Sequence, residues 1–187
     1  FHLDHIEGLH VLNKFSFPSL TILGQKGTAQ VLSTIVNEPF TVPLDCQPYP
    51  VEIRELLPGP YKLPFPLECR FLRHASPCLG CRLELDGKII AYIPDTGPCE
   101  NAVLLAEDAD LLITECAFLP GEECETWPHL NPQDAADIAR RARAKRLALT
   151  HFDAGRYTSL QMRHQARATA EGFSHIVVAE DEMVLHL

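Results

Sequence analysis

The sequence opens with the stretch Phe1-His2-Leu3-Asp4-His5, which leads into an apolar helical start. Two imidazoles and one carboxylate therefore stand close together in the chain. Imidazole and carboxylate ligands suit zinc, manganese or iron, and such a cluster on one turn can serve two metal ions at once. Short clusters of this kind also occur in solvated loops. The cluster gains weight because single His and Asp residues recur later, each after an apolar, strand-like run.

Length and charge restrict the class of protein. With 187 residues, of which 46% are hydrophobic and 22% charged, the chain fits one globular domain spanning residues 1–187. Sixteen basic residues against 25 acidic ones give a net charge of −9. This balance disfavours a non-specific nucleic-acid binder, which needs a basic face to neutralise phosphates. A single phosphate ester can still bind where metal ions supply the positive charge.

The cysteines indicate a reduced, cytoplasmic protein. Their number, seven, is odd, and their spacing is not that of a disulfide framework. Cys78 and Cys81 form a C-x-x-C pair, but no second such pair completes a zinc knuckle, so we interpret both as packed small residues. No apolar run reaches the roughly 20 residues of a membrane span, and no membrane partner is expected.

The order of the apolar runs predicts a mixed α/β layered domain, with a meander of strands first and strand–helix alternation after it. Asp86-Gly87 is typical of a type I′ hairpin turn between strands at Cys81–Leu85 and Lys88–Ile93. Thr28 is predicted to cap a helix that runs to about Val36. The other predicted strands are Leu20–Leu23, Val51–Leu56, Leu67–Leu72, Asp110–Thr114, Arg146–Thr150, Ile176–Ala179 and Met183–Leu187, and the other helices are Asn101–Glu107, Pro132–Ala144 and Ser159–Glu171.

Three of the predicted strands run directly into polar residues. Leu67–Arg73 leads to His74, Ile89–Pro94 leads to Asp95, and Arg146–Thr150 leads to His151. A single His after a strand is more often a structural residue than a ligand. In layered α/β proteins the site lies at the strand ends, so three such residues together with the N-terminal cluster predict a metal centre.

Together these stretches resemble the motifs of the metallo-β-lactamase-fold hydrolases, and within them the ribonuclease Z-like branch. The family's first motif is His-x-His-x-Asp-His, and Phe1-His2-Leu3-Asp4-His5 matches all of it except the first His, which would precede Phe1. The stretch from His74 to Gly80 resembles the next ligand motif. Asp95-Thr96-Gly97-Pro98 resembles the bridging-Asp motif, and Leu149-Thr150-His151-Phe152 the last ligand motif. The resemblance runs from Phe1 to Leu187, and the motifs in this order are specific to the family.

The resemblance implies an α/β (α+β four-layer) fold, the metallo-β-lactamase αββα sandwich, with the N-terminal strands missing from this chain. It implies two divalent metal ions, with zinc favoured and manganese or iron as alternatives. Two such ions can share a hydroxide, lower its pKa and clamp the attacking and leaving oxygens of a displacement. Asp4 would also orient the attacking water. The implied ligands are His2 and His74, with the absent upstream His, for the first metal, Asp4, His5 and His151 for the second, and Asp95 as the bridge.

Further roles follow from the same resemblance. His129 stands where the branch has a His that donates a proton to the leaving oxygen or clamps the phosphate; a solvent-facing residue at a helix start is the alternative. Glu115, at the end of a predicted strand, could orient His129 or could be a structural partner of an Arg. Arg156-Tyr157 resembles the Arg-Tyr that follows the last ligand, one residue later than in the family.

Two departures from the family limit how far its function carries over. The tRNA-processing members have a long basic arm between the second-motif His and the bridging Asp, whereas here one hairpin fills that interval, so a tRNA substrate is not expected. Leu57-Pro58-Gly59-Pro60 is similar to the tip of that arm but precedes His74, and we interpret it as a turn. The first ligand His and the N-terminal strands are absent, so we expect the native protein to begin upstream of Phe1.

The leading functional hypothesis is a two-metal hydrolase, a phosphodiesterase that attacks a small phosphodiester with a metal-bound hydroxide. One alternative is a hydrolase of a lactone, thioester, β-lactam or sulfate ester on the same site. The other is a non-catalytic metal-binding scaffold, because a fold alone does not fix a function. The partner expected is a small-molecule substrate, and family members commonly pair as homodimers.

Overall fold

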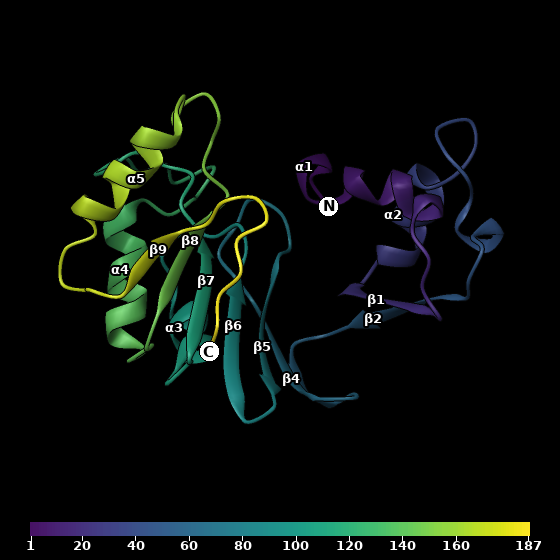
Figure 1. Ribbon diagram of the computed structural model, residues 1–187, viewed down its shortest axis with the longest axis horizontal. Helices are drawn as coiled ribbons and strands as arrows, with labels where there is room; N and C mark the ends of the chain where they lie inside the picture. The colour runs from purple at the N-terminus through teal and green to yellow at the C-terminus, as the bar shows by residue number, and fades with distance from the viewer. The chain divides into compact units, whose positions relative to one another are not determined.

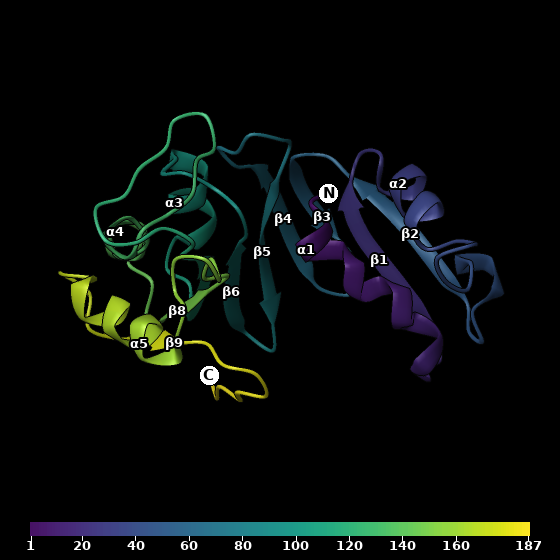
Figure 2. The same ribbon diagram turned by 90° about the horizontal axis from the view of Figure 1, so that it is seen from above.

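The computed structural model describes residues 1–187, and the chain divides into two compact units, Phe1–Leu57 and Pro58–Leu187. Each unit has its own sheet, with two strands in the first and seven in the second. Figure 1 shows the elements of both units, and Figure 2 shows them from above. A single domain over residues 1–187 stays a prediction.

The first unit is built on a parallel pair of strands. β1 (Leu20–Gln25) pairs with β2 (Val51–Leu56), and α2 (Thr28–Ile35) lies between them in the chain. The predicted cap was wrong, because Gly27, with a φ of 94°, is the N-cap of α2. Thr28 is already helical, and its hydroxyl donates to the Gln25 carbonyl at 2.6 Å. The remaining helical segments of this unit are α1 (Leu3–Ile6) and the 3₁₀ helices η1 (Glu7–Lys14) and η2 (Leu44–Cys46).

The second unit is one mixed sheet whose strand order follows the chain, from β3 to β9. β3 to β6 form an antiparallel meander, and β6 to β9 run parallel to one another. This confirms the predicted mixed α/β fold of meander followed by strand–helix units. The strands are β3 (Gly59–Lys62), β4 (Pro66–Phe71), β5 (Leu79–Leu85), β6 (Lys88–Ile93), β7 (Leu111–Glu115), β8 (Leu147–Thr150) and β9 (Ile176–Val178), and the helices are α3 (Glu100–Ala106), α4 (Pro132–Arg141) and α5 (Leu160–Thr169).

The turn between β5 and β6 is the predicted tight hairpin. Asp86 and Gly87 both have positive φ values, 50° and 73°. A type I′ turn requires positive φ at both central residues, which Asp tolerates and Gly adopts freely. The Asp-Gly pair was therefore a reliable local guide to this element.

Two predictions about the ends of the second unit were wrong. Gly59 and Pro60 do not form a turn but begin β3, the edge strand beside β4. An edge strand accepts proline because the missing N–H can face away from the ladder. Met183–Leu187 forms no strand. Met183, Val184 and Leu187 lie exposed, with Val184 74% accessible, so little apolar burial would stabilise a strand there.

The core of the second unit lies between the sheet and its helices. Ile93, Leu112 and Leu149 from three parallel strands pack in one buried cluster with residues of α3 and α4, such as Leu105 and Ile138. Figure 2 shows α3, α4 and α5 beside these strands. Burial of this apolar surface holds the parallel strands in place and fixes their C-terminal ends. No helix in the chain is both long and apolar enough to cross a membrane.

Candidate metal centre

Parallel pairing places the C-terminal ends of β6, β7 and β8 at one edge of the sheet. Asp95 follows β6 by two residues, Glu115 is the last residue of β7, and His151 directly follows β8. His151 has a φ of 50°, an uncommon conformation for a residue with a side chain, which breaks the extended direction of the strand. The structure thus brings three predicted site residues to one sheet edge.

The segment that carries Asp95 is tied to two neighbouring loops. The Gly97 N–H donates to the Arg73 carbonyl at 2.7 Å, next to His74. A Cβ on Gly97 would lie 2.7 Å from Cβ of Pro128, next to His129. Glycine is therefore required at position 97 by close packing. This packing holds the chain segments that bear His74, Asp95 and His129 against one another.

The tautomer of His74 follows from its hydrogen bond. Its Nδ1 lies 3.1 Å from the Pro128 carbonyl oxygen, which can only accept. Nδ1 therefore carries a proton, and in the neutral form of the ring the lone pair is on Nε2. The side chain is only 2% exposed, so the ring is fixed by its surroundings. Such an outer hydrogen bond is the usual way in which proteins orient a metal-binding imidazole.

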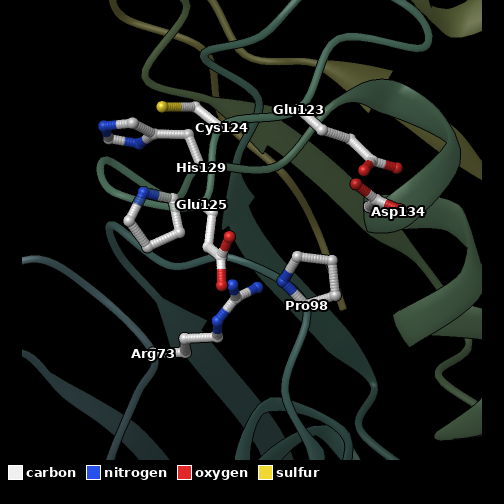
Figure 3. A pocket seen from close by; sticks show the side chains of 8 residues that line it. Arg73, Pro98, Glu123, Cys124, Glu125, His129 and Asp134 are labelled. Carbon is white, nitrogen blue, oxygen red and sulfur yellow. The ribbon is translucent and has the colours of Figure 1, made fainter.

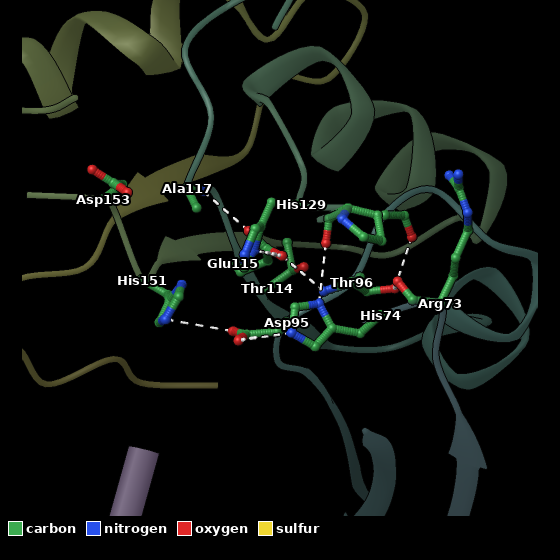
Figure 4. Close-up of polar contacts among 12 residues, drawn as sticks. Arg73, His74, Asp95, Thr96, Thr114, Glu115, Ala117, His129, His151 and Asp153 are labelled. Atoms are coloured by element: carbon green, nitrogen blue, oxygen red, sulfur yellow. Dashed lines mark hydrogen bonds and ion pairs between the residues drawn. The ribbon is translucent and has the colours of Figure 1, made fainter. Parts of the chain in front are cut away.

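Asp95 lies between two imidazoles. Its Oδ2 is 3.6 Å from Nε2 of His74, and its Oδ1 is 3.4 Å from Nε2 of His151. Figure 4 shows the two contacts leaving opposite sides of the carboxylate. Each carboxylate oxygen of Asp95 is thus paired with one imidazole nitrogen. The Asp95 side chain is 6% exposed.

His129 is held by Glu115. Its Nδ1 lies 2.7 Å from Oε1 of Glu115, whose side chain is fully buried. The same carboxylate accepts hydrogen bonds from the backbone N–H groups of Thr96 at 2.7 Å and Ala117 at 3.1 Å. Burial alone would lower the pKa of His129, but the hydrogen bond and charge of Glu115 outweigh it, and with the charge of Asp95 they raise that pKa.

The rings around the centre form a compact group. The centroid of His129 is 5.1 Å from that of His74 and 5.9 Å from that of His151. One donor atom each from Asp95, His129 and His151 lie within 4.8 Å of one another. The sequence predicted His129 as a catalytic residue only, and its proximity to the ligand atoms could not be found from spacing.

The donor set fits a divalent metal ion. Two imidazole nitrogens face one carboxylate in a mostly buried setting, and zinc, manganese and iron all accept such ligands. With Nδ1 of His74 occupied by a carbonyl, its Nε2 is directed to the centre. A carboxylate and two imidazole rings are side chains that commonly bind a divalent cation.

His2, Asp4 and His5 belong to the first unit. Asp4 and His5 are in α1, and His2 is its N-cap residue. Within this turn, Oδ2 of Asp4 lies 3.6 Å from Nε2 of His5. The predicted cluster thus exists as one helical turn, and its role as a ligand set stays a prediction.

A pocket of about 300 Å³ opens beside His129. In Figure 3 the carboxylates of Glu123 and Asp134 point toward each other, and the Arg73 guanidinium points toward Glu125. Sequence reasoning missed this lining, because loop charges show no periodicity; only the position of Arg73 next to His74 could have indicated it. The pocket is lined by Arg73, Pro98, Glu123, Cys124, Glu125, Pro128, His129 and Asp134.

Arg156 and Tyr157 have structural contacts. Arg156 binds both carboxylate oxygens of Glu122, with its Nε and Nη2 each 2.9 Å from one of them. Tyr157 is buried, and its hydroxyl donates to the Phe118 carbonyl at 2.7 Å. The pair therefore fastens the loop after β7 to the segment after β8.

Comparison with known proteins identifies the class. The sequence matches the family described as Beta-lactamase superfamily domain over residues 1–152, so the chain belongs to that family. It is 32% identical over 123 residues to a ribonuclease Z of Sulfurisphaera tokodaii, which covers 55% of this chain and 42% of the relative. It is 40% identical over 99 residues to a ribonuclease Z of Thermobifida fusca, which covers 52% of this chain and 31% of the relative.

A solved structure shows the same fold. The metallo-β-lactamase fold protein YhfI of Bacillus subtilis matches with a TM-score of 0.71 and 21% identity, over 96% of this chain and 70% of that one. The predicted metallo-β-lactamase fold is confirmed, and both curated relatives described above are named ribonuclease Z. The chain spans less than half the length of the curated relatives it matches.

Proposed function

We propose that this chain forms the centre of a two-metal phosphodiesterase that cleaves a small phosphodiester. His74, Asp95 and His151 would hold the ions, and by the family motif His2, Asp4 and His5 would supply further ligands. When bound, two divalent ions activate water and stabilise the charge that develops on the oxygens of an in-line displacement.

The observation that supports this proposal is the pairing of Asp95 with two histidines. Its two oxygens lie 3.6 Å and 3.4 Å from the Nε2 atoms of His74 and His151. A structural carboxylate is commonly paired with Lys or Arg, which neutralises it. An Asp placed between two imidazoles offers one oxygen on each side, which suits it to a shared position between two metal ions.

His129 is the group that we assign to proton transfer. Its Nδ1 is bound to Glu115, so the other nitrogen, Nε2, remains to donate a proton to the leaving oxygen. Glu115 is a positioning residue, because it fixes the ring and favours its protonated form. In many enzymes a catalytic imidazole is oriented in this way by a neighbouring carboxylate.

The pocket beside His129 supports a small substrate. Its lining has one guanidinium, from Arg73, against the carboxylates of Glu123, Glu125 and Asp134. A polyanionic RNA would meet repulsion from these carboxylates and from the net charge of −9. A single phosphodiester linkage could bind at the ions with Arg73 near one of its oxygens, and the pocket would receive the attached group.

The test is hydrolysis of bis(p-nitrophenyl) phosphate by the full-length protein. We expect turnover that EDTA abolishes and zinc restores, with no faster processing of a precursor tRNA. The matched control is His164→Ala, since His164 is an exposed histidine of α5 paired with Glu180 at 3.0 Å, and its activity should stay within about twofold. Turnover of lactones without phosphodiesters would replace this proposal with the second hydrolase class. Metal binding without any hydrolysis would favour a scaffold.

A further inference from the structure

Two cysteines face each other across neighbouring strands. β4 and β5 are antiparallel, and their register pairs Cys69 directly with Cys81. Directly opposed residues point to the same face of a sheet, and here the two Sγ atoms are 3.6 Å apart. Both thiols are free. Cys81, which the sequence showed only as part of a C-x-x-C pair with Cys78, is therefore in contact with Cys69 across the two strands.

The two thiols differ in accessibility and acidity. Cys69 is fully buried, whereas Cys81 is partly exposed. The hydrogen bond between them lowers the pKa of Cys81 against the effect of burial, while the same bond and burial both raise the pKa of Cys69. A partly exposed thiol of lower pKa beside a buried thiol is the arrangement of a peroxide-sensitive cysteine and its resolving partner.

We propose that Cys69 and Cys81 are a redox modification site at which a peroxide forms a reversible disulfide between β4 and β5. The Cys81 thiol is oxidised by hydrogen peroxide to a sulfenic acid, and one water is released. The Cys69 sulfur then attacks the sulfenic sulfur, and the hydroxyl leaves with the Cys69 proton as a second water. The net reaction consumes one peroxide and two thiols and yields one disulfide and two waters. A dithiol reductant reverses it by exchange.

The crosslink would close a short loop that contains His74. The segment from Cys69 to Cys81 runs from β4 through the turn bearing His74 and back into β5. A disulfide brings the sulfurs from 3.6 Å to about 2.05 Å and fixes both ends of this turn. The modification would therefore restrain the segment that presents His74, in addition to the hydrolytic role proposed for the site.

The test is thiol counting combined with peptide mapping on the full-length protein. Reduced protein is treated with hydrogen peroxide in the presence of EDTA, and free thiols are then alkylated under denaturing conditions. Of the seven cysteines in this chain we expect five to be labelled, with a mass loss of about 2 Da in the crosslinked pair. Trypsin should yield residues 63–70 joined to residues 74–82, and fragmentation must assign the bond to Cys81, because Cys78 is in the same peptide.

Two variants test which cysteine forms the disulfide with Cys69. Cys78→Ser should retain the crosslink, and Cys81→Ser should lose it; Cys81 is partly exposed, so this change is mild. In the crosslinked wild type we expect slower hydrogen exchange over residues 72–79 and a melting temperature higher by about 5 °C, effects that dithiothreitol removes. Labelling of all seven cysteines, a Cys69–Cys78 bond, or protection without the loss of mass would overturn the proposal.

Discussion

The two ends of the parallel strands carry carboxylates with different partners. At the N-terminal end of β7, Asp110 accepts from Nζ of Lys145 at 2.7 Å and from the Ile89 N–H at 2.9 Å. At the C-terminal end of the same strand, Glu115 is bound by His129 and by two backbone N–H groups. The carboxylate at the N-terminal end is paired with a lysine, and the carboxylate at the C-terminal end is paired with a histidine.

The partners of these carboxylates distinguish a structural end of the sheet from the end that has the candidate metal site. At the N-terminal end Asp110 is paired with Lys145, and it also binds the Ile89 N–H, so its contacts connect neighbouring segments of the sheet. At the other end Asp95 faces His74 and His151, and carboxylate and imidazole groups together are common ligands of divalent cations. In open α/β sheets ligands bind at the carboxyl ends of the strands, and the pattern of partners here follows that rule.

Replacement of Asp95, the proposed bridging carboxylate, should have the largest effect. Asp95→Asn keeps the shape of the side chain but removes its charge and one acceptor oxygen. We expect loss of bound metal and a fall in phosphodiester turnover of about 10³-fold. Elemental analysis and steady-state kinetics measure the two effects. Asp110→Asn, the same substitution at the other strand end, is the control and should keep its metal. Full metal content in Asp95→Asn would contradict the assignment.

Removal of the proposed proton donor should come next. His129→Ala is expected to lower kcat by about 10²-fold or more while the metal content stays unchanged, because the ring donates a proton and does not hold the ion. Kinetics on a substrate with a poor leaving group should show a larger loss than with p-nitrophenolate, which needs no proton. Metal loss equal to that of Asp95→Asn would instead make His129 a ligand.

A smaller effect on turnover is expected from replacing Glu115, the residue that orients His129. Glu115→Gln should lower kcat about 10- to 100-fold, in the range of outer-shell changes. Glu115 raises the pKa of His129, so its neutralisation should lower that pKa and leave less protonated imidazole at neutral pH. The basic limb of the kcat profile should then move to lower pH. An unshifted profile with the same loss of activity would indicate a purely structural role.

The smallest effect should be at the salt-bridged end. Asp110→Asn should leave turnover within about twofold and reduce only stability. Hydrogen bonds from Lys145 and from the Ile89 N–H hold the pKa of Asp110 below its usual value, so its stabilisation is present above the usual pKa and is lost as pH falls through the lowered one. The difference in melting temperature between wild type and variant should therefore be largest near neutral pH and shrink in acid. A constant difference would contradict this account.

Local sequence signals predicted several elements correctly. Asp and Gly both adopt the positive φ that a type I′ turn requires, so Asp86-Gly87 predicted a tight hairpin. The apolar runs of β7 and β8 bury easily and predicted parallel core strands. The predictions failed where an element depends on what lies beside it. Gly59 and Pro60 join an edge strand because they pair with β4, and Met183–Leu187 stays irregular because most of its side chains are exposed.

The sequence by itself determined the family, the fold class and the chemical identity of the candidate ligands. All three depend on which residues occur and in what order, and a motif such as Asp95-Thr96-Gly97 shows this directly in the sequence. Only the tertiary structure decided which residues these side chains contact. The Pro128 carbonyl sets the tautomer of His74, Glu115 holds His129, and Cys81 meets Cys69 across two strands. Each of these contacts joins residues far apart in the chain, and their distances depend on strand register and loop packing, which no local pattern encodes.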